Sequence, residues 1–151
     1  PISELTFDEA SELAYFGAKI LHPSTIVPAQ KYNVPVRLKN TMDEKAPGTI
    51  IASKGAAPGS FKAIAAKDGI TAINIRSSRM LMAYGFLRRV FEVFENHKTS
   101  IDMITTSEVA VSLTIDNASQ LPSIENELKK FGTIEVDKDQ TIICIVGQKN
   151  N

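Results

Sequence analysis

Hydroxyl and carboxylate side chains are concentrated between residues 100 and 108. They are Ser100, Asp102, Thr105, Thr106, Ser107 and Glu108. Asp102 and Glu108 could hold an ammonium group, because a cation withdrawn from water needs paired carboxylates. Upstream, Gly85 opens an expected helix, so the amides of Phe86 and Leu87 would point outward and could receive a carboxylate. A free amino acid carries both groups, so these residues form a candidate amino-acid site.

The same polar residues have a purely structural interpretation. Serine and threonine side chains often hydrogen-bond to nearby backbone groups, and this shapes turns without binding any ligand. From spacing alone, both interpretations stay open.

Other reactive chemistry has little support in the sequence. Neither His22 nor His97 lies near a serine or cysteine in a nucleophile pattern, and we interpret both histidines as structural or exposed. The chain has neither a Walker-type loop nor a G-x-G-x-x-G motif, so nothing in it is expected to hold a phosphate unaided. The single cysteine, Cys144, lies in an apolar run and excludes an internal disulfide framework.

The bulk composition indicates an ordinary soluble globule. Of 151 residues, 43% are apolar, and 17 Lys and Arg residues balance 17 Asp and Glu residues. This balance gives no general attraction to nucleic acid or to an anionic membrane. The basic pairs Arg88-Arg89 and Lys129-Lys130 are interpreted as solvated helix faces. Without a signal segment or an apolar run of about 18 residues, we expect a reduced, cytoplasmic protein.

The elements before residue 60 form one group. Thr6 and Glu9 have capping-box spacing and predict a helix running toward Leu21, interrupted by His22-Pro23. A short helix is expected over residues 24–32 and strands over 34–38 and 49–52. The small residues from Ser53 to Ser60 indicate a linker.

The elements after residue 70 form a second group. The order is strand 71–76, helix 86–97, strands 101–105 and 109–115, a helix bearing Leu121, Ile124 and Leu128, and strands 133–136 and 141–146. The apolar face of the first helix is expected to hold Phe86, Leu87, Val90, Phe91 and Phe94, and Gly132 is expected to cap the second. This βαββαβ order predicts an α+β, ferredoxin-like unit, with two helices on one face of a four-stranded antiparallel sheet.

Two motifs carry a resemblance to a known family. The stretch Ser100–Val109, SIDMITTSEV, resembles the first ACT domain of monofunctional, lysine-sensitive aspartate kinases. The stretch Phe16–Pro23, FGAKILHP, resembles the end of their catalytic domain. The motifs occur in the family's order, and the resemblance covers about residues 7–147.

The resemblance implies a domain organisation. Residues 1–53 would be the C-terminal segment of the kinase catalytic domain, 54–69 a linker, 70–140 the ACT regulatory domain and 141–151 the first strand of a truncated second ACT domain. A chain that opens on Pro1 rather than methionine is expected to be a piece of a longer protein.

The resemblance also implies site residues. Lys19 and Ile20 match ATP-binding positions, whereas the rest of the kinase machinery would lie upstream, so the fragment alone is expected to be inactive. The intact enzyme would use ATP with Mg²⁺; the fragment should require no cofactor, and it is expected to have no metal site. The implied effector-binding residues are Met80, Gly85, Phe86, Leu87, Ser100, Ile101, Asp102, Thr106, Ser107 and Glu108.

The implied function is feedback control of aspartate phosphorylation, which converts ATP and L-aspartate to 4-phospho-L-aspartate, the first step toward lysine, threonine and methionine. Lysine is the expected effector, and the ACT domains are expected to form a homodimer. Met82 and Ala83 stand where the family has polar residues, which leaves threonine or a lost response open. Two alternatives remain: a stand-alone amino-acid sensor, and a dimerisation module that has lost its pocket.

Overall fold

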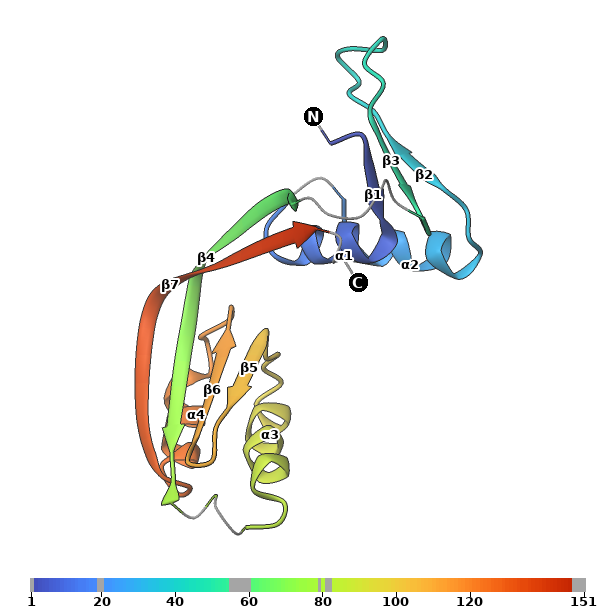
Figure 1. The fold of residues 1–151 in the computed structure, drawn as a ribbon. Helices are drawn as coiled ribbons and strands as arrows, with labels where there is room; N and C mark the ends of the chain where they lie inside the picture. Colours follow the sequence, from blue (N-terminus) through green and yellow to red (C-terminus); the bar gives the residue numbers. More distant parts are fainter. Residues whose placement is uncertain (1, 19–20, 55–60, 79, 81–82, 148–151) are drawn as a thin grey trace. The chain divides into compact units, whose positions relative to one another are not determined.

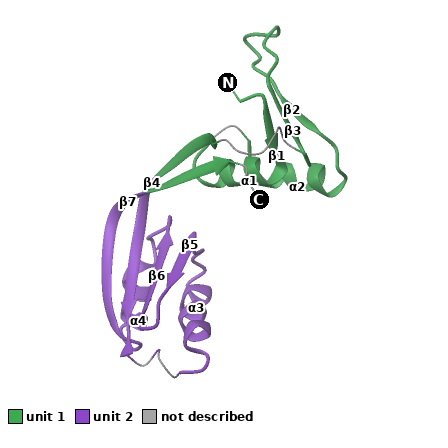
Figure 2. Ribbon diagram, viewed as in Figure 1, with its two compact units in different colours: residues 1–67, 142–151 green, residues 68–141 purple. Residues whose placement is uncertain are grey.

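The structure, a computed structural model, describes residues 2–18, 21–54, 61–78, 80 and 83–147. The chain divides into two compact units (Figure 2). Unit 1 comprises residues 1–67 and 142–151, and unit 2 comprises residues 68–141. The predicted Lys19 and Ile20 lie outside the described residues, as does Met82.

Unit 2 has the predicted βαββαβ order (Figure 1). Its four-stranded sheet has the order β5-β6-β4-β7, and β6 pairs antiparallel with both β4 and β5. β4 and β7 run in opposite directions, because Asp68 contacts Thr141 at one end and Arg76 contacts Glu135 at the other. The elements are β4 (Phe61–Arg76), α3 (Phe86–Asn96), β5 (Met103–Thr106), β6 (Ala110–Ile115), α4 (Leu121–Leu128) and β7 (Thr133–Gly147).

Alternation in the sequence explains how this sheet acquires its buried face. Ile73 lies opposite Leu113 and Ile75 opposite Val111, so all four side chains point to the same side. They are at most 1% exposed and pack with buried residues of both α3 and α4. Both helices therefore cover one face of the sheet, as predicted.

The residues of α3 that are buried in this core differ from the predicted set. Phe86, Val90, Val93 and Phe94 are buried, whereas Phe91 is 40% exposed. Residues three and four apart share a helix face, so Val93 belongs with Val90 and Phe94, while Phe91 lies at the edge of the stripe.

Gly132 does not cap α4, so this prediction is wrong. The helix ends at its C-cap residue Lys129, and Gly132 has no positive φ. A Cβ atom at Gly132 would lie 2.1 Å from the carbonyl oxygen of Arg76. Glycine is needed here because the start of β7 packs directly against the end of β4.

The strands β4 and β7 are longer than predicted. β4 starts at Phe61, so residues 61–69 of the expected linker are strand, and β7 continues through the break expected between residues 136 and 141. Gly69 and Asp139 lie within these strands at positive φ, 74° and 55°. Such residues are typical of turns, yet both strands continue through them.

Unit 1 contains a three-stranded sheet beside two helices. The sheet order is β1-β3-β2, with β1 parallel and β2 antiparallel to β3. Its core includes Leu5, Phe7, Leu13, Ile26 and Ile51. The elements are β1 (Glu4–Thr6), α1 (Phe7–Tyr15), α2 (Pro23–Lys31), β2 (Val36–Leu38) and β3 (Thr49–Ala52).

The capping box of α1 is confirmed. The Glu9 amide donates to Thr6 Oγ1 at 3.1 Å, and the Thr6 amide donates to Glu9 Oε2 at 2.8 Å. The helix ends at Tyr15 rather than near Leu21. Gly17 follows at φ 105°, and a Cβ atom there would meet the Ala66 carbonyl at 2.4 Å, so close packing against β4 stops the helix.

Candidate functional site

Tight turns occur among the described residues between β4 and α3. The Met80 amide donates to the Ser77 carbonyl at 3.2 Å, and the Phe86 amide donates to the Ala83 carbonyl, also at 3.2 Å. In this structure the Phe86 amide therefore already has a backbone partner, whereas its role toward a ligand stays a prediction. That the Leu87 amide and the positive end of the helix dipole receive a carboxylate also stays a prediction.

Gly85 occupies the N-cap position of α3, where its sequence position predicted it. Its φ and ψ are 75° and 15°, in the left-handed region, and it offers no side-chain cap. A Cβ atom at Gly85 would have open space around it, so the backbone conformation alone favours glycine.

The strand β5, at an edge of the sheet, carries Thr105 and Thr106 of the predicted polar residues, and the other polar residues flank it. Thr106 lies opposite Val111, so its side chain points toward the face that the helices cover. All four residues of β5 are nevertheless exposed, because an edge strand has a sheet neighbour on one side only.

Asp102 is held more tightly than the residues around it. Its amide donates to the Thr114 carbonyl at 2.8 Å, which extends the β5–β6 pairing by one residue, and its Oδ2 atom is buried. Ser100 and Glu108, at the two ends of the motif, are exposed. The two carboxylates proposed to hold an ammonium group therefore differ in solvation.

Ser107 shapes the turn between β5 and β6. Its amide donates to the Ala110 carbonyl at 2.8 Å, and its Oγ accepts from the Ala110 amide at 3.1 Å. For this residue the structural interpretation of the polar cluster holds, since the hydroxyl already has a backbone partner.

The predicted site residues separate into two groups. The apolar members come together around the core of unit 2, where Phe86 is buried and Met80, Leu87 and Ile101 pack against the same cluster, as does Ala83. The polar members follow β5 and its flanking residues, namely Ser100, Asp102, Thr106, Ser107 and Glu108.

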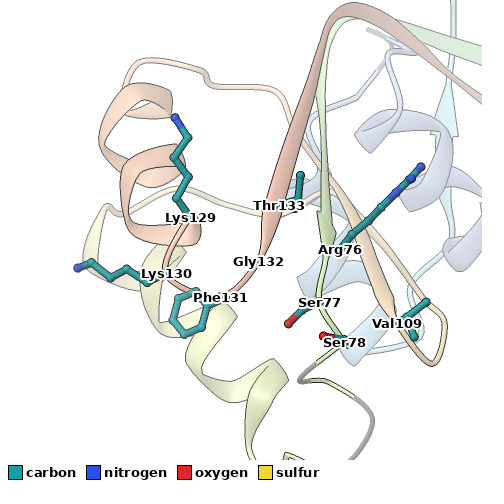
Figure 3. A pocket seen from close by; sticks show the side chains of 9 residues that line it. All are labelled: Arg76, Ser77, Ser78, Val109, Lys129, Lys130, Phe131, Gly132 and Thr133. Atoms are coloured by element: carbon teal, nitrogen blue, oxygen red, sulfur yellow. The ribbon is translucent and has the colours of Figure 1, made fainter.

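A basic recess in unit 2 was not predicted. It has a volume of about 420 Å³ and lies where the ends of β4 and α4 meet the start of β7 (Figure 3). Its lining includes Arg76, Lys129 and Lys130. The pair Lys129-Lys130 was visible in the sequence, but only the tertiary structure brings it near Arg76.

Among the described residues, the lowered carboxylate pKa lies away from these sites, in unit 1. Burial alone would raise the pKa of Glu9, but hydrogen bonds from Lys62 and Thr6 outweigh this effect and hold the pKa below its ordinary value. The Lys62 Nζ lies 2.9 Å from Glu9 Oε2, and the two side chains are 9% and 10% exposed.

Within the described ranges no group of three or more histidine, cysteine or acidic side chains is arranged to hold a metal ion. None of the helices seen in those ranges combines the length and apolar character needed to cross a membrane.

The sequence of unit 2 matches a known family model. Residues 73–121 match the ACT domain family, and this range contains α3, β5, β6 and the polar motif of the candidate site.

Longer similarity extends over nearly the whole chain. Aspartokinase 3, chloroplastic, from Arabidopsis thaliana is 41% identical over 97% of this chain, and lysine-sensitive aspartokinase 3 from Escherichia coli is 36% identical over 97%. The solved structure of E. coli aspartokinase III in complex with lysine and aspartate has a TM-score of 0.83 at 38% identity, again over 97% of this chain. The chain spans 28% of the Arabidopsis relative, 34% of the E. coli relative and 34% of the solved chain. The protein is therefore an aspartokinase homologue that covers about a third of the length of these relatives and contains an ACT domain.

Proposed function

We propose that this chain is the regulatory part of an aspartate kinase and that unit 2 binds an amino-acid effector, most suitably lysine, for feedback inhibition. The parent enzyme would transfer a phosphoryl group from ATP to the side-chain carboxylate of L-aspartate. The ACT match in unit 2 supports the regulatory role, and the E. coli relative solved with lysine and aspartate supports the choice of effector.

The buried carboxylate oxygen of Asp102 is the observation on which the ligand assignment rests. A half-buried carboxylate with one oxygen withdrawn from water at the edge of a sheet is suited to bind a cationic group that is itself leaving water. Glu108 supplies a second, solvated negative charge at the other end of β5. Lysine carries two ammonium groups and so suits a site with two separate carboxylates.

The start of α3 is the proposed receptor of the effector's carboxylate. Gly85 places the first turn of an 11-residue helix at the end of the β4–α3 segment, and the positive end of the helix dipole attracts an anion there. Because the Phe86 amide already donates to Ala83, the proposal assigns the direct hydrogen bond to the Leu87 amide.

A homodimer through unit 2 is part of the same proposal. β5 is an edge strand, and its apolar side chains Met103 and Ile104 are 45% and 41% exposed. An exposed edge with apolar side chains is a surface on which a second copy can pair. The effector residues on β5 would then lie at the interface.

The catalytic half of the proposal concerns the parent enzyme. ATP with Mg²⁺ would be its nucleotide substrate, and Lys19 and Ile20 are assigned to the nucleotide site by the FGAKILHP motif. A cytoplasmic location also stays a prediction, since the Arabidopsis relative is described as chloroplastic.

Calorimetric titration of the 151-residue chain with lysine and with threonine tests the ligand assignment. We expect lysine to bind, and Asp102→Asn to weaken binding by about tenfold or more, because a hydrogen bond to a charged group is worth roughly 1.5–3 kcal/mol. Asp139→Asn is the matched control. It removes the same charge from an exposed position in unit 2, and asparagine tolerates the positive φ found there.

Sedimentation at each ligand concentration tests the homodimer in the same samples. Binding of threonine alone would reassign the effector. An absence of heat with both amino acids from a chain that is dimeric and folded would contradict the sensing role. Equal weakening by Asp102→Asn and Asp139→Asn would remove Asp102 from the site.

A further inference from the structure

The basic recess of unit 2 lies outside the proposed effector site. It lies where β4 ends, α4 ends and β7 begins (Figure 3). None of its lining residues belongs to the predicted effector set. They are Arg76, Ser77, Ser78, Val109, Lys129, Lys130, Phe131, Gly132 and Thr133.

The charge of this lining is one-sided. It includes one arginine, two lysines and three hydroxyl side chains, and it includes no carboxylate. The nearest counter-ions belong to other residues: Lys129 Nζ lies 2.8 Å from Glu125 Oε1, and Arg76 Nη2 lies 3.7 Å from Glu135 Oε2. The Arg76 pair is loose and largely exposed, so an incoming anion can compete with it.

The two serines and the two lysines occupy different sides of the recess. Figure 3 shows the hydroxyls of Ser77 and Ser78 close together at the end of β4, and the lysine side chains extending outward from the end of α4. Lysine has four rotatable side-chain bonds, so an ammonium group can turn toward a bound anion, although Lys129 would then give up its 2.8 Å contact with Glu125. Phosphate and carboxylate oxygens accept strong hydrogen bonds from such ammonium groups and from hydroxyls.

The backbone around the recess is tightly packed. Gly132 is so close to the end of β4 that an added Cβ would also lie 3.0 Å from the Ser77 side chain. The Phe131 ring meets Phe86 edge-to-face, with ring centroids 6.2 Å apart. Ser77 is only 7% exposed. The lysine side chains therefore lie beside a tightly packed polar surface, which is the arrangement expected of a preformed small-molecule site.

We propose that this recess is a second ligand site of unit 2, which binds a small anionic molecule through a phosphate or carboxylate group. A volume of about 420 Å³ lies in the range of ligand pockets and exceeds the needs of a lone inorganic anion. Val109 and Phe131 offer apolar contact to the remainder of the ligand.

The test is a titration of the ¹⁵N-labelled 151-residue chain, followed by NMR. Sodium phosphate and sodium malonate are the two probes, and sodium chloride at equal ionic strength is the reference. The amides of Ser77, Ser78, Gly132 and Thr133 report on the recess. We expect the chemical shifts of these amides to change saturably with at least one probe. The probe that binds with the higher affinity shows whether the site prefers a phosphate or a carboxylate group.

A pair of charge-matched variants completes the test. Lys129→Gln/Lys130→Gln should weaken binding of the preferred probe by about tenfold. Lys98→Gln/Lys138→Gln removes the same charge from exposed positions outside the recess and should leave binding nearly unchanged. Shifts no larger than those with chloride, or equal weakening by the two variants, would overturn the proposal. Lysine binding at the effector site is measured separately, so failure of one site leaves the other intact.

Discussion

The two units of this chain are stabilised in different ways. Unit 2 has one apolar cluster, built from regularly alternating strands and two amphipathic helices. Unit 1 has a smaller apolar cluster and, in addition, a nearly buried ion pair between Glu9 and Lys62, which are 53 residues apart in the sequence. The first arrangement can be read from local periodicity, whereas the second depends on contacts between distant residues.

The exposed surfaces of the units differ as well. In unit 1, Phe61, Tyr32, Ile64 and Ile143 are 84%, 71%, 70% and 66% exposed. In unit 2, the exposed apolar residues of the sheet concentrate at β5, beside the proposed effector site. The exposed apolar side chains of unit 2 that lie in its sheet are thus confined to one strand, whereas those of unit 1 come from several segments.

Truncation in the core of unit 2 should have the largest effect and shows whether the units unfold separately. Phe94 is 2% exposed, so Phe94→Ala should lower the free energy of unfolding by about 3–5 kcal/mol. Hydrogen exchange should show that amides of residues 68–141 lose protection, whereas amides of unit 1 keep their protection. Phe91→Ala, in the same helix at 40% exposure, should cost much less. Equal loss in both units would mean that they form one cooperative body.

Removal of Lys62 should have an intermediate effect, confined to unit 1. Lys62→Met takes away a hydrogen bond to an ionised Glu9 and should cost roughly 1.5–3 kcal/mol at neutral pH, measured by urea unfolding. Lys54→Met, at an exposed position of unit 1, is the control.

The pH dependence sharpens this prediction. The pKa of Glu9 is held below its unfolded value of about 4.3, so its contribution to stability is complete above that pH and is lost as the pH falls through the lower folded value. The difference between wild type and Lys62→Met should therefore shrink on acidification below about pH 4. A difference that stays constant to pH 2 would show that Lys62 acts through packing of its side chain instead.

The smallest effect is expected at Cys144 in unit 1. Burial, together with the negative charge of Glu12, raises the pKa of this thiol. Less thiolate is then present at neutral pH, so alkylation by iodoacetamide should be slower than for an unfolded control in urea. Glu12→Gln should increase the alkylation rate slightly, because it removes one of the two causes of the raised thiol pKa. An alkylation rate equal to that of the unfolded chain would contradict the burial of Cys144.

Local sequence signals were sufficient for much of unit 2. The alternation of Val111, Leu113 and Ile115 predicted β6 because side chains in a strand point alternately to opposite faces. The spacing of Val90 and Phe94 predicted α3 for the corresponding helical reason. The βαββαβ order followed from these elements together, and the SIDMITTSEV motif indicated the family.

The strand β1 and the full lengths of β4 and β7 were not predicted, because they depend on pairing between distant segments. β1 has three residues and becomes a strand only through parallel pairing with β3, where Glu4 lies opposite Ile50. The extra length of β4 and β7 has the same origin, since the two strands are neighbours in the sheet. A segment of this kind carries little periodicity of its own, because its hydrogen-bond partners lie elsewhere in the sequence.

The features of the candidate sites likewise divide into those that the sequence predicts and those that depend on the fold. By itself, the sequence determined which residue types are available for an amino-acid ligand, and it placed Gly85 at the start of a helix and Asp102 and Glu108 in one short polar motif. The local turn before α3 decided that the Phe86 amide is already bonded, and tertiary structure decided that Asp102 has a buried oxygen. It also decided that Gly132 permits close packing and that Lys129 and Lys130 share a recess with Arg76. The physical reason is that residue type and spacing specify chemistry and local conformation, whereas solvation and proximity depend on the whole fold.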